Sequence, residues 1–527
     1  MPGIRATAWS VLAGVLVWCA LALPASLSEL SPAALLRLPV LALVLVAVLL
    51  VVRTRAAVVA LGVALALVVV LKVVDIGFSA ALNRQFHLAY DVANLWRGFD
   101  VLADWKGLAW AVGAVAALLV GAAVLVIVLV PAMLRLSDVI TRHRRGAVTL
   151  LLVGVVGAVL GTQVRGADIV STATATLVRD HATSVYADYR DASVFAAEIA
   201  DQPLAGQSRP LGDLAGKDVL IIFVESYGRS SLTDPELAKT VAPVLTTGTS
   251  SLAGAGFESR SGWLTSPTFG GESWLAHATL QSGLWVDSGR RYEQLLGAER
   301  VTLTRAFGEA GWRTSFVMPS VQGDWPAGQE FYGFDELYGA AELGYRGPPH
   351  GWGGIPDQYT LSWLQRSVLS ETSTPVMAEV SLVSSHNPWP DPPPLLPWDE
   401  IGDGSAYACL PGCAEEGPDD VRSQYAASIA YSLKSVISFV VERPDPDLVV
   451  VLVGDHQPWR YVTGEDPSHD VPITLIAADP AVVDQITGWG WTPGMMPDPG
   501  APVWRMDTVQ DRFIRAFSAP PEVQQQQ

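Results

Sequence analysis

The chain has 527 residues, half of them hydrophobic, and a positive mean hydropathy of +0.31. This apolar content excludes a single ordinary soluble domain of that length. The formal net charge of −18 at pH 7 makes the chain a poor candidate for binding nucleic acid.

The hydrophobic residues are concentrated in the first third of the chain. Five apolar runs of about 20 residues occur there, and each is long enough to cross a bilayer as a helix. They occupy residues 8–26, 34–52, 56–74, 108–130 and 147–165. The first run ends in LALPAS, which resembles a signal-peptide cleavage site, but the four runs that follow favour a retained helix. The sequence therefore predicts a membrane domain of five transmembrane helices over residues 1–167.

Basic residues beside these runs predict the topology. Arg5, the Arg53 and Arg55 pair, and an arginine cluster at 135–145 fall on alternate sides of successive helices. Placing them in the cytoplasm puts the N-terminus inside and the C-terminus outside, with five crossings. Residues 1–167 carry a net charge of +7 and residues 168–527 carry −25, which fits an acidic domain beyond the membrane. We expect a multi-pass protein of a bacterial cytoplasmic membrane with an extracytoplasmic domain.

The external part has its own organisation. Residues 168–215 read as a helical connector, residues 216–520 as one domain, and residues 521–527 as a disordered tail. Short apolar runs alternate with helical patterns from residue 217, which indicates an α/β domain with a mostly parallel sheet sandwiched between helices. Cys409 and Cys413 are expected to form a small disulfide, and a two-cysteine metal site is the weaker alternative.

Polar side chains follow three of the predicted strands. Glu225 ends DVLIIFVES, His386 follows VMAEVSLV, and Asp455 with His456 follows LVVVLVG. The carboxyl ends of parallel strands meet at one edge of a sheet, so these side chains are expected to lie close together. Carboxylate oxygens with an imidazole nitrogen suit Zn²⁺ or Mn²⁺ better than Ca²⁺. We therefore predict a site for one divalent ion, with a second ion as an alternative.

The stretch SPTFGGESWLAHATLQSG at 266–283 offers a nucleophile. Two glycines allow a tight turn, and Ser273 then opens a helix, where free backbone N–H groups favour an anion. A serine oxygen bound to a divalent cation loses its proton readily and becomes a nucleophile. The plain alternative, a helix cap, is disfavoured by Glu225 and the Asp455-His456 pair. Thr268 is the second candidate for the nucleophile.

These motifs, in this order, resemble the alkaline phosphatase superfamily. The motifs are VES after the first strand, the Gly-Gly-x-Ser helix start, SSHNPW and GDHQPW. The resemblance covers nearly the whole chain and is closest to sulfatase-like membrane enzymes, including lipoteichoic acid synthases and phosphoethanolamine transferases. Those enzymes also have five membrane helices followed by an extracytoplasmic catalytic domain.

The resemblance implies roles for individual residues. Glu225, Asp455 and His456 match the metal ligands, together with the nucleophile Ser273, which stands ten residues before Gly283 as in sulfatases and nucleotide pyrophosphatases. The lipoteichoic acid and phosphoethanolamine branches use threonine at that position. Three residues match substrate-binding positions: His386, Trp325 and His469. The basic residue that the resemblance leads us to expect near Trp325 is missing.

The same stretch argues against sulfatase chemistry. Sulfatases modify a Cys or Ser within Cys/Ser-x-Pro/Ala-x-Arg, but here Leu275 and His277 occupy the small and the arginine positions. We therefore expect a metal-dependent phosphotransferase or phosphodiesterase that moves a phospho-headgroup, such as phosphoglycerol or phosphoethanolamine. The donor would be a phospholipid and the acceptor an envelope glycan or lipid, through a phosphoserine enzyme. A phosphoester or sulfatase-like hydrolase is the alternative, and a non-enzymatic envelope scaffold is less favoured.

Overall fold

The computed structural model describes twelve stretches of the chain. These are residues 2–24, 30–88, 91–92, 99, 102–103, 107–163, 169–202, 210–321, 323–370, 374–409, 420–464 and 467–518. The chain divides into two compact units, Met1–Asp191 and Ala192–Gln527, with the border inside helix α8 (Ala173–Ala200). The predicted tail at 521–527 and the side chains of the predicted cysteine pair lie outside the described residues.

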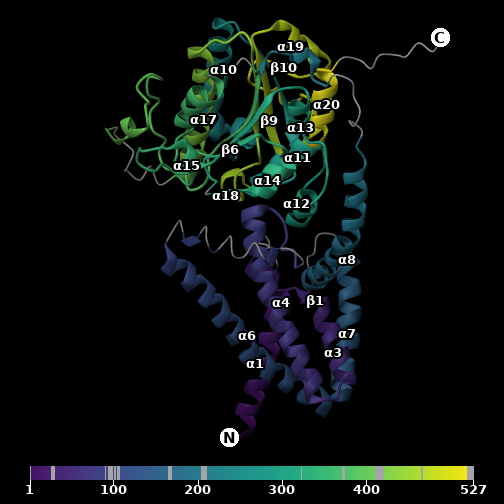
Figure 1. Cartoon of the computed structure of the whole chain (residues 1–527). Coiled ribbons are helices and arrows are strands. Elements are labelled where there is room, and N and C mark those ends of the chain that lie inside the picture. The colour runs from purple at the N-terminus through teal and green to yellow at the C-terminus, as the bar shows by residue number, and fades with distance from the viewer. Residues whose placement is uncertain are drawn as a thin grey trace, which may run out of the picture. The chain divides into compact units, whose positions relative to one another are not determined.

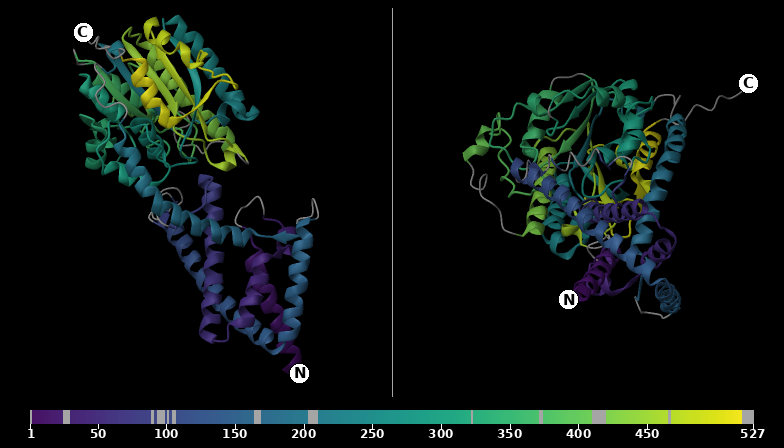
Figure 2. Two further views of the ribbon diagram at one scale, coloured as in Figure 1. Left: turned by 90° about the vertical axis from the view of Figure 1, so that its right-hand side faces the viewer. Right: turned by 90° about the horizontal axis from the view of Figure 1, so that it is seen from below.

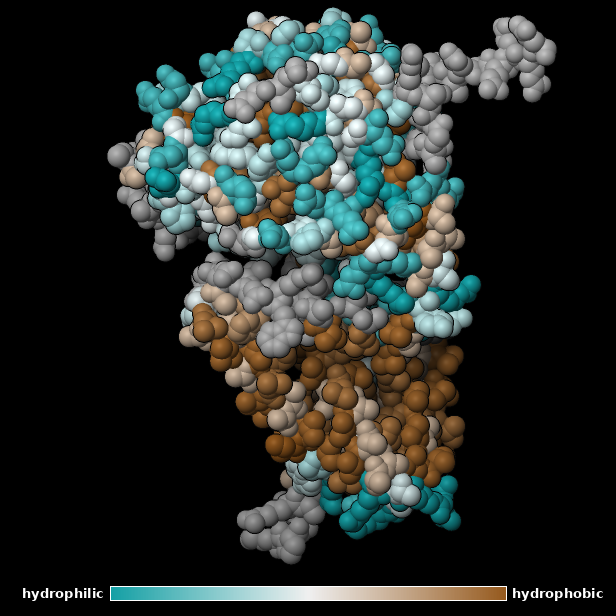
Figure 3. All heavy atoms as spheres, in the orientation of Figure 1, coloured by the Kyte–Doolittle hydropathy of each residue, from teal (hydrophilic) through white to brown (hydrophobic). Residues whose placement is uncertain are grey.

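The first unit is built from apolar helices. They are α1 (Pro2–Ala22), α2 (Pro32–Leu36), α3 (Val40–Val51), α4 (Arg55–Leu82), α6 (Leu108–Arg142) and α7 (Arg144–Gln163), and a short parallel pair joins β1 (Leu38–Pro39) to β2 (Val170–Ser171). Figure 3 shows hydrophobic residues gathered over these helices. Within the described residues, three helical segments are long and apolar enough to cross a membrane: Arg55–Ala80, Leu108–Arg142 and Arg144–Gly161.

The other two predicted spans are helical but shorter. The apolar segments there are Thr7–Ala22 and Val40–Val51. The second has 12 residues, and a helix of that length extends about 18 Å, against a hydrocarbon core of about 30 Å. Pro39 lies within the predicted run, and the helix begins only after it, because proline has no N–H to donate in a helix interior. Five crossings therefore stay a prediction.

In the described part of the second unit, nine strands form one mixed sheet. Its strands are β3 (Asp218–Val224), β4 (Glu258–Thr265), β5 (Arg313–Val317), β6 (Glu336–Tyr338), β7 (Val376–Leu382), β8 (Leu448–Gly454), β9 (Asp470–Ala477), β10 (Thr492–Pro493) and β11 (Val503–Arg505). The order is β10-β4-β9-β8-β3-β7-β5-β6, and β11 also pairs with β4. The half from β8 to β6 is parallel, whereas β9 is antiparallel to both β8 and β4.

The mixed sheet corrects the expectation of a mostly parallel one. The connection from β8 to β9 contains only the four-residue helix α18 (Arg460–Thr463) in its described part, whereas a parallel crossover usually needs a full helix. The chain therefore turns back and places β9 antiparallel. Strand β4, with the sequence ESRSGWLT, was not predicted, because it lacks the continuous apolar run of a doubly covered strand.

Helices cover both faces of this sheet (Figures 1 and 2). Along β3, Leu220, Ile222 and Val224 pack on one side, and the alternate residues pack on the other, as the two-residue period of a strand requires. The first side meets α10 (Pro235–Gly254), α16 (Asp357–Leu364) and α17 (Val421–Glu442). The second meets α11 (Ser273–Ser282), α13 (Leu303–Glu309), α19 (Pro480–Gln485) and α20 (Val509–Ala516). Smaller helices are α9 (Ser230–Thr233), α12 (Gly289–Leu296), α14 (Pro326–Tyr332) and α15 (Ala340–Leu343).

The parallel half of the sheet determines where polar residues gather. Strands β7, β3 and β8 are adjacent and point the same way, with Val224 level with Leu382 and Gly454. The residues immediately after these three strands therefore emerge at one edge.

Candidate metal centre and nucleophile

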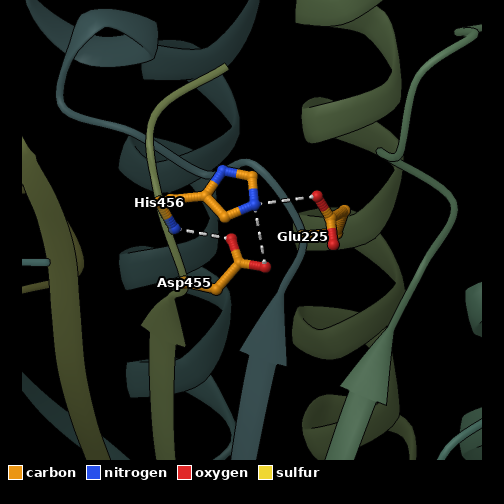
Figure 4. A group of neighbouring side chains, drawn as sticks. All are labelled: Glu225, Asp455 and His456. Carbon is orange, nitrogen blue, oxygen red and sulfur yellow. Dashed lines mark hydrogen bonds and ion pairs between the residues drawn. The ribbon is translucent and has the colours of Figure 1, made fainter. Parts of the chain in front are cut away.

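Glu225, Asp455 and His456 come together at that edge (Figure 4). One ligand atom from each lies within 4.8 Å of the others, and all three side chains are buried. His456 Nε2 is 3.3 Å from Glu225 Oε1 and 3.7 Å from Asp455 Oδ2. Buried carboxylates this close together need a positive partner.

The backbone orients both ligands that follow β8. His456 Nδ1 is 2.8 Å from the carbonyl oxygen of Gln457. A carbonyl only accepts, so Nδ1 carries a hydrogen and Nε2 faces the carboxylates, the arrangement of a metal-binding histidine. Asp455 Oδ1 accepts from the backbone N–H groups of Ser226 and His456, each at 2.7 Å. Asp455 Oδ2 therefore remains the oxygen that turns towards the centre.

Electrostatics at this group favour a bound cation. Burial, and then the charge of Glu225, raise the pKa of the Asp455 carboxyl to about 7. Burial alone would lower the pKa of His456, but the two carboxylates raise it to about 9. Burial would likewise raise the pKa of Glu225, but the charges of His456 and His386 hold it well below its usual value. Two carboxylates, an imidazole and a hydroxyl are a donor set that fits Zn²⁺ or Mn²⁺.

Ser273 supplies that hydroxyl. It is the first residue of α11 and is half-buried. Its Oγ donates to Glu225 Oε2 at 3.0 Å and lies 3.2 Å from His456 Nε2. The turn before it needs left-handed backbone at Gly270 and Glu272, with φ of 71° and 62°. Glycine adopts such angles without steric cost.

Thr268, the alternative nucleophile, is placed differently. It is 5 % exposed, and its Oγ1 donates to the carbonyl oxygen of Gly271 at 2.5 Å. This hydroxyl therefore stabilises the glycine turn before Ser273.

Serine hydroxyls, which sequence reasoning missed, hold the backbone of the centre in place. Ser385 Oγ donates to the carbonyl oxygen of Glu225 and Ser266 Oγ to that of Asp455, both at 2.6 Å. Ser226 Oγ donates to Glu225 Oε1 at 2.8 Å. The only signal for these residues in the sequence is their place next to a ligand or a strand end, which many structural serines share.

The three predicted substrate-binding residues have different surroundings. The charges of Glu225 and His456 influence the pKa of His386, which burial lowers, so His386 lies beside the centre. Burial also lowers the pKa of His469, on which the charge of His456 acts. The ring of Trp325 instead packs in an aromatic cluster, with ring centroids 6.4 Å from Phe316 and 5.7 Å from Tyr332. The charge of His456 therefore acts on both histidines, whereas Trp325 packs among aromatic rings.

A buried polar network anchors the nucleophile helix to the sheet. Glu379 in β7 is 1 % exposed, and its carboxylate bonds His277 Nδ1 at 2.6 Å and accepts a short hydrogen bond from Gln281. Residues 273, 277 and 281 lie one turn apart, so they share one face of α11. The ring of His277 also stacks on Phe223 of β3, with centroids 3.8 Å apart. The signal for this network is the lone glutamate inside the apolar strand VMAEVSLV, because a buried carboxylate requires a partner.

We expect Glu379→Ala to lower the free energy of unfolding by about 3–5 kcal/mol, because it leaves His277 buried without its partner. Thermal and urea unfolding of the full chain would measure this. Glu336→Ala is the matched control, since its ion pair with Arg313 is partly exposed and such pairs contribute about 0–1 kcal/mol. Equal losses in the two variants would contradict the prediction. A double-mutant cycle with His277→Ala would isolate the coupling between the two side chains.

Comparison with known proteins gives structural similarities only. No protein-family model and no curated protein sequence matches the chain. The chain is similar to the lipoteichoic acid synthase LtaP from Listeria monocytogenes, at 18 % identity over 51 % of this chain and 69 % of that one, with a TM-score of 0.36. It is similar to a protein of the alkaline phosphatase superfamily from Vibrio parahaemolyticus, at 15 % identity over 51 % and 60 % of the two chains, with a TM-score of 0.35.

The similarity to a third structure extends over more of the chain. This is the integral membrane protein lipooligosaccharide phosphoethanolamine transferase A from Neisseria meningitidis, at 13 % identity, with a TM-score of 0.43. The match covers 86 % of this chain and 83 % of that one.

Proposed function

We propose that the chain is a metal-dependent phosphotransferase anchored in the membrane. Ser273 would take a phospho-headgroup from a phospholipid and pass it to an envelope glycan or lipid. The observation that carries this proposal is the position of Ser273 Oγ, 3.0 Å from Glu225 Oε2 and 3.2 Å from His456 Nε2, at the start of a helix. A nucleophile and a candidate cation site meet there at the N-terminus of a helix, and phosphoryl transfer uses both.

Four residues would hold one divalent ion, Zn²⁺ or Mn²⁺: Glu225, Ser273, Asp455 and His456. When bound, the ion would lower the pKa of the serine hydroxyl and stabilise negative charge on phosphorus. The Ser273 hydroxyl already donates to Glu225 Oε2, and its proton would pass on to the oxygen that leaves phosphorus, so that this step balances. The backbone N–H groups at the start of α11 would face the oxygens of the bound phosphate.

His386 is suited to handle the proton of the alcohol that leaves or enters. Its Nδ1 is 2.5 Å from the carbonyl oxygen of Asn387, so Nδ1 carries a hydrogen. Burial lowers the pKa of His386, which favours the neutral ring. Nε2 is then a free acceptor beside the centre, and can take a proton from an incoming hydroxyl or return one to a leaving oxygen. His469 would line the other side of the bound substrate.

The apolar helices of the first unit support a lipid donor. Within the described residues, three of them are long enough to span a bilayer, and a membrane anchor would confine the chain to a lipid surface. We propose residues 216–520 as the catalytic domain on the extracytoplasmic side, with the N-terminus in the cytoplasm.

The test is covalent labelling of the full chain in detergent. The protein is incubated with Mn²⁺ or Zn²⁺ and phospholipids labelled in the headgroup, and peptide mass spectrometry then locates the modification. We expect a phospho-headgroup on Ser273 that disappears when an acceptor is added. Donor cleavage with no modified serine would overturn the covalent route, and release to water alone, whatever acceptor is present, would identify a hydrolase.

A further inference from the structure

Two exposed aromatic side chains set one surface of the second unit apart. Trp352 is 42 % exposed and Tyr461 is 48 % exposed. Among the described residues of that unit, no other aromatic side chain is as exposed as these two. Exposed apolar side chains that lie close together and are rimmed by polar groups mark candidate binding sites.

Both side chains contact the loop that follows β7, which lies beside the proposed metal centre. The indole of Trp352 stacks on the imidazole of His386, with centroids 4.1 Å apart and planes 21° apart. The Tyr461 hydroxyl donates to Asn387 Oδ1 at 3.2 Å. The exposed aromatics therefore flank His386 and Asn387, and the neighbouring Ser385 donates its hydroxyl hydrogen to the carbonyl oxygen of Glu225 at 2.6 Å.

The segment that carries Trp352 is fixed to the same loop. Asp357 Oδ1 accepts from the backbone N–H groups of Val383 and Ser384, each at 2.9 Å, and Ser432 Oγ of α17 donates to Asp357 Oδ2. Close approach adds to this, because a Cβ on Gly353 would lie 2.3 Å from the side chain of Val383. The stack of Trp352 on His386 is thus built into the fold.

Tyr461 is linked through Trp459 to the backbone that precedes Ser273. The ring of Trp459 packs edge-on against Tyr461, with centroids 5.5 Å apart. Its Nε1 donates to the carbonyl oxygen of Gly270, in the turn that leads to Ser273. Both aromatic rings are therefore held by segments that also position the reacting groups.

We infer that Trp352 and Tyr461 bind the acceptor of the proposed transfer, and that the acceptor is a sugar or a similar polyol. The C–H faces of a sugar ring pack on aromatic rings, and its hydroxyls can bond the Asn387 amide between them. Acyl chains of a lipid donor would need a continuous apolar surface, whereas this one is interrupted by an amide and an imidazole. This inference rests on the proposed function.

The step that this surface serves is the second half of the transfer. The acceptor hydroxyl oxygen forms a bond to phosphorus, and the bond between phosphorus and Ser273 Oγ breaks. The hydroxyl proton passes first to His386 Nε2 and finally to the released Ser273 oxygen, so no further reactant is consumed. Bound sugar also displaces water from the same position, which would favour transfer over hydrolysis.

The experiment compares Trp352→Ala and Tyr461→Ala with Trp489→Ala in the full chain. Trp489 is the matched control, because its ring packs on Trp491 and Trp504 instead of on the loop after β7. Each protein receives Mn²⁺ and a headgroup-labelled phospholipid, with either methyl glucoside, maltotriose or glycerol as the acceptor. The ratio of labelled acceptor to free headgroup is the readout.

We expect Trp352→Ala to lower that ratio about tenfold or more for the best acceptor, a change of about 1.4 kcal/mol, and Trp489→Ala to leave it as in the wild type. Trp352→Phe retains a ring and should recover part of the ratio. An unchanged ratio in Trp352→Ala with every acceptor would overturn the inference. So would a loss seen only with donor in vesicles and not in detergent, which would identify a membrane contact instead.

A binding experiment separates this inference from the proposed function. Saturation-transfer NMR measures whether the Ser273→Ala chain binds the same three sugar and polyol probes. Binding that disappears in the Ser273→Ala, Trp352→Ala double variant supports the acceptor site even if no transfer occurs. Absence of binding by all three probes contradicts the site, even if donor cleavage and the modified Ser273 are both found.

Discussion

Replacing Ser273 with alanine is expected to abolish the covalent phospho-enzyme and to lower the rate of headgroup transfer by about a thousandfold or more, because removal of a nucleophile leaves only binding and electrostatic stabilisation. The hydroxyl is half-buried at the start of α11 and bonds Glu225 at 3.0 Å. Alanine is an excellent helix former, so α11 should keep its position. Peptide mass spectrometry and product formation over time measure the two effects.

Two further variants make this result specific. Thr268→Ala should transfer the headgroup within about tenfold of the wild-type rate, because its hydroxyl only supports the turn at Gly271 and one hydrogen bond contributes about 1 kcal/mol. Ser273→Thr keeps the nucleophilic oxygen and should retain the covalent species. If Thr268→Ala loses the modified peptide while Ser273→Ala retains it, the nucleophile is Thr268.

Strands β7, β3 and β8, which are neighbours in the parallel half, were predictable because each lies in a largely apolar run, whereas the three-residue strand β6 was not predicted. The runs DVLIIFVES, VMAEVSLV and LVVVLVG contain the strands β3, β7 and β8 of the structure. Their ends also predicted which side chains meet, since residues after parallel neighbours emerge at one edge, and Glu225, Asp455 and His456 do lie together. The direction of β9 was not predictable from its apolar pattern, because a buried antiparallel strand has the same composition as a parallel one.

Loops were the part that the sequence could not place. Trp325 and Trp352 both stand in glycine-rich and proline-rich segments, and nothing local separates them. The difference arises from long-range contacts: Trp325 packs among aromatic rings from β5 and α14, whereas Asp357 holds the Trp352 segment against the β7 exit. The polar anchor of α11 was missed for a similar reason, because Glu379 and His277 are 102 positions apart in the sequence.

The second large effect is expected at the metal centre. Asp455→Asn should weaken the binding of the cation while it leaves the fold intact. Asp455 Oδ1 accepts two backbone N–H bonds, and the asparagine oxygen can accept the same two. The amide nitrogen then replaces Oδ2, which faces the centre, and a nitrogen with two hydrogens cannot bind a cation. Affinity for Mn²⁺ or Zn²⁺ should fall at least a hundredfold, and transfer should fall with it.

Unfolding experiments can detect this loss without any substrate. A ligand at 100 times its Kd stabilises the wild-type fold by about 2.7 kcal/mol, and a hundredfold weaker site gains only about 0.4 kcal/mol at the same concentration. Thermal unfolding with and without added ion would show the difference, and Asp445→Asn, at an exposed carboxylate, is the control. Equal stabilisation of Asp455→Asn and wild type would place the cation elsewhere.

Without bound metal, we expect Asp455→Asn to raise the stability of the fold relative to the wild type. Burial and the charge of Glu225 raise the pKa of Asp455 from 3.8 to about 7, so ionisation of this carboxyl is less favourable in the fold than in the unfolded chain. The metal-free wild type therefore loses stability as the pH rises from about 4 to 7, because the unfolded chain releases this proton first. Asparagine cannot ionise. After a chelator has removed the metal, Asp455→Asn should therefore be more stable than the wild type at pH 8. The wild type should regain the advantage when the ion is restored, because the cation compensates the charge that destabilises the empty centre.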